Sequence, residues 1–221
     1  MNFPEKQRKK IALLGGTFDP IHLGHIALAE AAYRTLGVDE VVFLPTQLRY
    51  YKKESAGSEL YERYAMLAMA LEPYDHMVIS DLELQTDPEK NYTVNTLRTM
   101  KEMFPDTELC FVIGGDSLEH LATWRSPEEL MRLATFAAAV RGDVDREKAV
   151  RLIEQYQKDF PGSRFELLDM EPCNISSTDI RKKASEGESL EGLVSPEVER
   201  FIRKQGLYQK EENVVWNEKK C

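Results

Sequence analysis

The stretch IALLGGTFDPIHLGH, Ile11–His25, sets the fold of this chain. Its apolar run ends in Gly15 and Gly16, and two histidines, His22 and His25, follow three residues apart. A strand that ends in a glycine turn and leads into a helix is the opening unit of a parallel α/β sheet, whose ligands gather where the strands end. The glycines let a ligand approach the backbone, and the first helical turn offers unpaired N–H groups to phosphate.

Short apolar runs alternate with segments of helical period along the rest of the chain. The predicted strands are residues 10–16, 40–46, 77–84, 108–115, 135–142 and 164–170. The predicted helices include 25–36, 58–72 with an apolar face of Leu60, Tyr64, Leu67, Ala68 and Leu71, and two that start at the Ser-Pro-Glu sequences of 126–128 and 195–197, the last stopping at Gly206. We predict a single-domain, Rossmann-like, doubly wound parallel sheet of five to six strands with flanking helices over residues 10–208, and a charged, loose tail over 209–221.

The composition of the chain disfavours several classes of function. The 221 residues carry 29 Lys and Arg against 38 Asp and Glu, a net charge of −9, and so lack the overall basic character of a general nucleic-acid binder. The three cysteines, Cys110, Cys173 and Cys221, are far apart and form no CxxC pair, which favours a reduced compartment. No apolar stretch is long enough for a membrane span or a signal peptide. We therefore expect a cytoplasmic protein without nucleic-acid or membrane partners.

Three interpretations of the histidine pair compete. A zinc site is disfavoured because the metalloprotease spacing is four with an intervening Glu, and neither is present. A single histidine at this position would more often cap the helix or pack in the core. Two histidines beside a glycine turn favour phosphate contact, although no Gly-Lys-Ser/Thr of a P-loop follows.

Two motifs together resemble a known superfamily. GGTFDPIHLGH (15–25) is similar to the (T/S)xxxH…HxGH signature of the nucleotidyltransferases, and its FDPIH form resembles the nicotinate-nucleotide adenylyltransferase family. The second signature is NISSTDIRKK from Asn174, where the spacing of Ser176 and Asp179 predicts a helix start. The resemblance implies catalytic roles for His22, His25 and Arg181. It implies ATP contacts from Gly15, Gly16, Thr17, Phe18, His22, His25, Gly114, Asp116, Ile175, Ser177, Thr178 and Arg181.

Further segments resemble the acceptor side of the same family. They are NYTVNTL (91–97) and FVIGGDSLEHLATW (111–124), and the resemblance extends to the GLY of 206–208. The acceptor residues implied are Lys52, Tyr92, Thr93, Asp116, Trp124 and Arg141, with Trp124 stacked on the pyridine ring. Trp124 as a core aromatic and Asp116 as a helix cap stay open. The loop PTQLRYYKKESAGS (45–58) lacks the family's Pro-Pro-His, and AVRGD (139–143) lacks its proline, so Arg49 or Lys53 also stands as a candidate cation.

The resemblance implies adenylyl transfer from ATP to nicotinate mononucleotide, a step of NAD biosynthesis, by direct in-line attack with release of pyrophosphate. Mg²⁺ would accompany ATP, held by phosphates and water rather than by protein side chains. Two alternatives stay open: another acceptor, such as nicotinamide mononucleotide or a different phosphate, and a catalytically silent nucleotide-binding regulator of the same fold. The oligomeric state is not determined by the sequence.

Overall fold

A six-stranded, all-parallel sheet forms the centre of the computed structural model, which describes residues 10–46, 58–85, 87, 90–140, 142–170, 173 and 175–209. The strands lie in the order β3-β2-β1-β4-β5-β6, which confirms the predicted Rossmann-like fold. Their bounds are Lys10–Gly16 (β1), Glu40–Pro45 (β2), Met77–Ile79 (β3), Glu108–Gly114 (β4), Thr135–Val140 (β5) and Arg164–Asp169 (β6).

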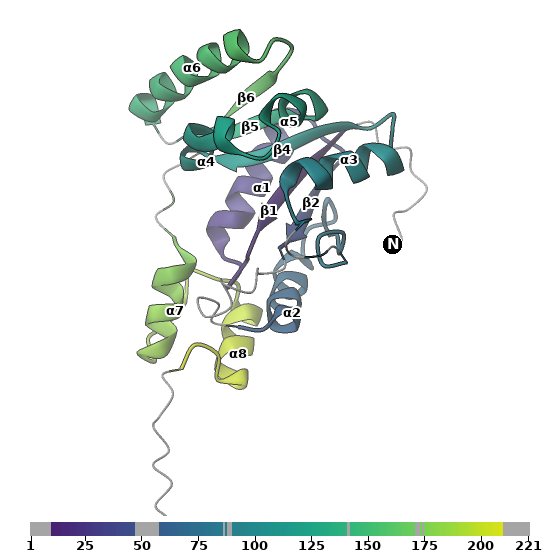
Figure 1. The fold of residues 1–221 in the computed structure, drawn as a ribbon. Coiled ribbons are helices and arrows are strands. Elements are labelled where there is room, and N and C mark those ends of the chain that lie inside the picture. The colour runs from purple at the N-terminus through teal and green to yellow at the C-terminus, as the bar shows by residue number, and fades with distance from the viewer. Residues whose placement is uncertain are drawn as a thin grey trace, which may run out of the picture.

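Helices cover both faces of this sheet (Figure 1). One buried cluster joins the sheet to α1 (Leu23–Leu36), α2 (Leu60–Leu71), α7 (Ser177–Ser185) and α8 (Pro196–Gln205). The other joins it to α3 (Thr93–Met103), α4 (Gly115–His120), the 3₁₀ turn η3 (Leu121–Thr123), α5 (Pro127–Leu133) and α6 (Gly142–Asp159). Side chains that follow one another along β1 enter opposite clusters, so the central strands are buried on both faces.

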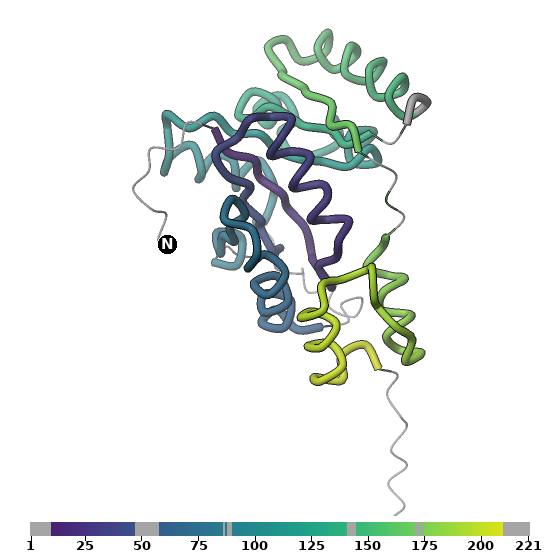
Figure 2. The backbone as a smooth tube through the Cα atoms, turned by 180° about the vertical axis from the view of Figure 1, so that it is seen from behind, coloured from purple at the N-terminus to yellow at the C-terminus, as the bar shows by residue number. Residues whose placement is uncertain are grey.

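The last two helices gather at the end of the sheet where β1 stops, as the views from both sides show (Figures 1 and 2). Ser195 caps α8 by accepting a hydrogen bond from the Val198 N–H, and α8 ends at Gly206, whose φ is 64°. The predicted stop of this helix is thereby confirmed. The C-terminal helices thus lie beside the glycine turn, although they come last in the sequence.

The predicted strand 77–84 is too long. β3 ends at Ile79, because the chain turns at Ser80, whose Oγ accepts a hydrogen bond from the Leu82 N–H. A side chain that bonds its own backbone in this way competes with the ladder of a strand. Residues 210–221 of the predicted tail lie outside the described residues.

No helix in the described part of the chain is long and apolar enough to cross a membrane.

Candidate active site

A cavity of about 390 Å³ opens at the carboxyl ends of β4 and β5 and against the start of α1, the helix that follows β1. Its walls come from the start of α1, the β4–α4 turn, the end of β5 and the side of α6. The strand order reverses between β1 and β4. Ligands of doubly wound sheets bind at this topological switch point. The lining includes five of the predicted ATP-site residues: His22, His25, Gly114, Asp116 and Ile175.

The two histidines form one unit at the start of α1. His22 is the N-cap residue and His25 occupies the third helical position, so the spacing of three brings their rings together. The rings stack with centroids 3.7 Å apart and planes inclined by 27°. The His22 backbone N–H donates to Nδ1 of His25 at 3.3 Å. Since Nδ1 accepts, a neutral His25 must carry its proton on Nε2, where it can donate to a ligand.

Burial keeps this pair neutral. Desolvation lowers the pKa of His22 to about 4, and desolvation together with the neighbouring His22 lowers the pKa of His25 to about 3. Nδ1 of His22 is buried and has no hydrogen-bond partner within the described residues. A buried polar atom without a partner is costly, and a ligand that bonds the ring would remove that cost.

The second motif closes onto the glycine turn from α7. Ser176 caps α7 by accepting from the Asp179 N–H at 3.1 Å, as its spacing predicts. Ser177 Oγ donates to the Pro20 carbonyl at 3.0 Å, and Arg181 Nη1 donates to the Asp19 carbonyl at 2.7 Å. Two segments more than 150 residues apart therefore meet on adjacent carbonyl groups.

The remaining residues of the glycine turn have different environments. Gly15 and Gly16 end β1, and Thr17 is exposed. Phe18 is buried, with its ring edge-on to His25 at 5.1 Å, and it is not among the residues that line the cavity. Its side chain therefore supports the histidine from the core. On α7, Thr178 is exposed and lies 3.4 Å from Arg181 Nη2.

Of the predicted acceptor residues that the structure describes, Asp116 lines this cavity, whereas Tyr92, Thr93 and Trp124 do not. Tyr92 is the N-cap residue of α3 and Thr93 is its first residue. Trp124 is half-buried and packs edge-on against Phe111, at a centroid distance of 6.2 Å. A Cβ on Gly15 would come 3.5 Å from the same Phe111 ring, which places Trp124 one side chain away from the glycine turn.

Glu83 is a buried carboxylate that sequence reasoning missed on the acceptor side. It accepts hydrogen bonds from Thr96 Oγ1 at 2.9 Å and Asn91 Nδ2 at 3.3 Å, and a further one from the side chain of Thr46. Burial raises its pKa. The Thr46 N–H donates to the Gly16 carbonyl at 2.9 Å, so Glu83 connects the acceptor segment with the glycine turn.

Three further residues hydrogen-bond the segment that follows Gly16: Arg63, Ser58 and Tyr208. The sequence analysis did not identify them either. The predicted apolar face of 58–72 is wrong in part: the buried residues of α2 are Arg63, Met66, Leu67, Ala70 and Leu71, and not Leu60, Tyr64 or Ala68. Because Arg63 is charged, the apolar pattern did not identify it as part of the buried face of α2.

Two predicted site residues, Lys52 and Arg141, lie outside the described residues.

Among the described residues, no group of three or more His, Cys, Asp or Glu side chains is placed so that it could hold a metal ion.

The parallel sheet with two converging motifs at its switch point defines a nucleotidyltransferase. A family model described as Cytidylyltransferase-like matches residues 13–183, and the chain belongs to that family. Within it, the chain is a member of the nicotinate-nucleotide adenylyltransferase family. Two relatives named "Probable nicotinate-nucleotide adenylyltransferase" are 36% identical over 90% of this chain and 99% of the relative (Lachnoclostridium phytofermentans), and 37% identical over 92% and 97% (Symbiobacterium thermophilum).

A solved structure shares the fold. The Plasmodium falciparum nicotinic acid mononucleotide adenylyltransferase in complex with NaAD superposes with a TM-score of 0.72 at 22% identity, over 90% of this chain and 97% of that one. The same enzyme in complex with APC gives a TM-score of 0.71 at 21% identity.

Proposed function

We propose that this protein transfers the adenylyl group of ATP to nicotinate mononucleotide and releases pyrophosphate. The observation that carries the proposal is the meeting of α7 with the glycine turn: Arg181 and Ser177 bond the Asp19 and Pro20 carbonyls beside the stacked histidines. Hydroxyl, guanidinium and imidazole donors are thereby brought to the end of the strand at which phosphate binds in such folds.

The chemistry needs no covalent enzyme intermediate. A phosphate oxygen of the acceptor forms the new bond to the α-phosphorus, and the bond from that phosphorus to the pyrophosphate oxygen breaks. Negative charge that develops on the leaving group would be met by Nε2–H of His25, by the His22 ring and by Arg181, in a reaction that depends mainly on positioning. Mg²⁺ enters with ATP, as part of that substrate.

The acceptor is assigned from the names of the relatives and from the surface that Tyr92, Thr93 and Trp124 share with Arg125, whose guanidinium lies 5.7 Å over the Tyr92 ring. An indole face suits a flat, cationic pyridinium ring. Arg125 supplies a positive charge beside it, which suits an anionic nicotinate more than a neutral amide.

Pyrophosphate release from ATP and Mg²⁺ tests the proposal, with nicotinate mononucleotide and nicotinamide mononucleotide assayed side by side. We expect release with the acid and a kcat/KM at least tenfold lower with the amide. Equal use of the two would contradict the acceptor assignment. Absence of release with either, in a protein that binds ATP, would indicate the silent nucleotide-binding alternative. The no-acceptor reaction and the His22→Asn variant serve as blanks.

A further inference from the structure

Asp19, within the first motif, is a residue only 3% exposed. Its Oδ1 accepts a hydrogen bond from Ser58 Oγ at 2.5 Å and another from Tyr208 Oη at 2.8 Å. Its own backbone carbonyl accepts from Arg181. The side chain of Asp19 thus bonds two hydroxyl groups, while its backbone carbonyl bonds the guanidinium of Arg181, which is predicted to bind phosphate.

Arg63 fixes the neighbouring backbone. Its guanidinium is 2% exposed, and Nη1 donates to the Thr17 carbonyl at 2.6 Å and to the Thr46 carbonyl at 3.1 Å. Attraction to Asp19 compensates part of the desolvation that lowers the pKa of Arg63. Residues 17–19 are therefore held both through the carbonyl of Thr17 and through the carboxylate of Asp19.

Backbone strain marks the same place. Phe18 and Tyr208 have φ angles of 50° and 65°, and both are bulky residues in the left-handed region. Phe18 precedes Asp19 in the chain, and the Tyr208 hydroxyl donates a hydrogen bond to the Asp19 side chain. Such conformations persist where the surrounding contacts over-determine them, and they concentrate at functional sites.

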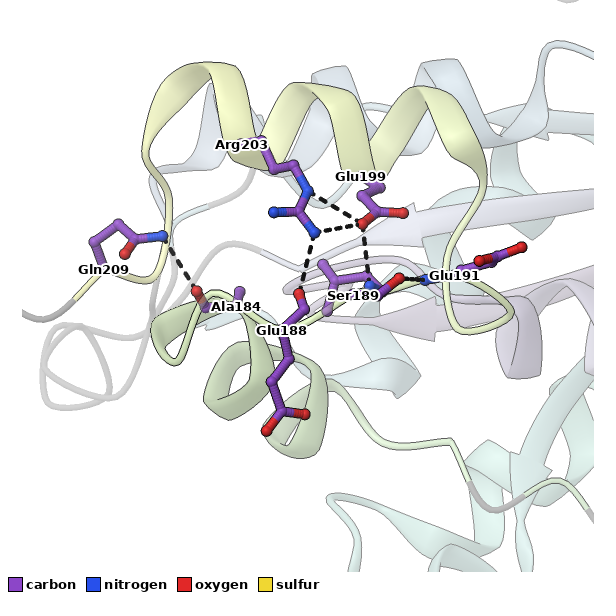
Figure 3. A network of polar contacts seen from close by, with 8 residues as sticks. Ala184, Glu188, Ser189, Glu191, Glu199, Arg203 and Gln209 are labelled. Carbon is purple, nitrogen blue, oxygen red and sulfur yellow. Dashed lines mark hydrogen bonds and ion pairs between the residues drawn. The ribbon is translucent and has the colours of Figure 1, made fainter.

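Tyr208 is itself held firmly at the end of α8. The Leu207 N–H bonds the Ile202 carbonyl at 3.0 Å, and Gln209 Nε2 bonds the Ala184 carbonyl of α7 at 3.2 Å. Figure 3 shows the polar network that includes this Gln209 bond, in which Arg203 also bonds Glu199 on its own helix and reaches the carbonyl of Glu188 in the α7–α8 connection. The segment that presents the Tyr208 hydroxyl is thus docked against α7.

We propose that Tyr208, together with Ser58, is a positioning residue for ATP: the two hydroxyls fix the Asp19 side chain, and Asp19 in turn fixes Arg181 through its carbonyl. The inference rests on the proposed function for its kinetic readout. It assigns to the C-terminal end of α8 a part in ATP binding that neither motif contains.

Tyr208→Phe removes the hydroxyl alone and is the first test. We expect kcat/KM for ATP to fall at least tenfold, with the acceptor KM changed less than twofold, because a small misplacement of phosphate-binding groups strongly slows positioned chemistry. Ser58→Ala deletes the second hydroxyl of the same network and is expected to act in the same direction. Should Tyr208→Phe fail to fold, Ser58→Ala decides.

Two further measurements separate positioning from general loosening. In a double-mutant cycle, Tyr208→Phe in an Asp19→Ala background should cost less than twofold, since its partner is already gone. Tyr74→Phe is the matched control: Tyr74, like Tyr208, packs against the same core cluster, and its hydroxyl has no hydrogen-bond partner among the described residues. It should leave both KM values unchanged.

A binding experiment distinguishes a failure of the positioning role of Tyr208 from a failure of the proposed function. Equilibrium binding of a non-hydrolysable ATP analogue needs no acceptor, and Tyr208→Phe should weaken it at least fivefold even if the acceptor assignment is wrong. Wild-type analogue affinity and wild-type kcat/KM for ATP in both hydroxyl variants would overturn the inference. An equal loss in Tyr74→Phe, or a full additional loss of Tyr208→Phe in the Asp19→Ala background, would overturn it too.

Discussion

The backbone N–H of His22 donates to Nδ1 of His25, and the rings of the two residues stack at 3.7 Å. The bond that starts α1 therefore also selects the tautomer that presents Nε2–H of His25. A polar residue at an N-cap or third helical position ordinarily serves the helix alone. Here the His25 side chain serves both helix initiation and the candidate site, and His22 combines the N-cap position with a ring at that site; this overlap determines how they should be mutated.

His22→Asn should separate the two roles. Asparagine is among the best N-cap residues, so the helix start is retained while the ring is lost. We expect kcat to fall about 10²–10³-fold, the usual cost of losing one donor to developing charge. The thermal midpoint should stay within a few degrees of wild type. A kcat within threefold of wild type would exclude the His22 ring from the reaction.

Stability of the ligand-free protein should rise with pH between about 4 and 6.5. The pKa of His22 is lowered from 6.5 to about 4 in the folded state, so the unfolded chain binds more protons in this window. The stability is lost as the pH falls towards 4, on the order of 3 kcal/mol for His22 alone. Urea unfolding at several pH values measures it, and His22→Asn should flatten the curve. An unchanged pH dependence in the variant would show that His22 is not the group responsible.

Gly24→Ala should impair activity without unfolding the protein. A Cβ on Gly24 would come 3.0 Å from Nδ1 of His22 and 3.2 Å from Sγ of Cys173, so both neighbours would have to shift by a few tenths of an ångström. The helix itself gains about 1 kcal/mol from alanine, which offsets part of the strain. We expect kcat to fall at least tenfold, while the unfolding free energy changes by less than about 1 kcal/mol. Cys173→Ala, combined with Gly24→Ala, should restore part of the rate by making room; no recovery would indicate that the clash acts through the ring.

Glu83→Gln should raise the KM for the acceptor about tenfold and leave the KM for ATP within twofold. Three hydrogen-bond donors converge on this carboxylate, and an amide offers one oxygen and adds its own N–H₂, so at least one donor loses its partner. The segment around Asn91 and Tyr92 should loosen as a result. Steady-state kinetics with each substrate varied in turn provide the test. An equal rise in both KM values would speak for a general loss of structure.

Local patterns sufficed for the fold and for the two motifs. The existence of the six strands, the Ser176 cap and the stop at Gly206 each depend on residues near one another in sequence, and all three are confirmed. The hydrogen-bonded partners of Asp19 could not be predicted in this way. Ser58 and Tyr208 are 39 and 189 residues away from it, and no periodicity connects them.

The charges of Arg63 and Glu83 explain why the sequence analysis did not identify these two residues as buried. Arg63 interrupts an apolar face and Glu83 is a charged residue near the end of the predicted strand 77–84, and a pattern of hydrophobicity assigns such charged residues to solvent. Both are buried because backbone carbonyls or side-chain donors satisfy them, a condition that only the folded chain reveals.

The hydrogen bond between Tyr208 and Asp19, which are 189 residues apart, also has a consequence for the synthesis of the protein. Because synthesis proceeds from the N-terminus, a growing chain holds both signature motifs before it holds the Tyr208 hydroxyl, which bonds the Asp19 side chain of the first motif. Full affinity for ATP should then arise only after Tyr208 has been added. A fragment that stops after α7 would keep the recognisable sequence of a nucleotidyltransferase and lack its action.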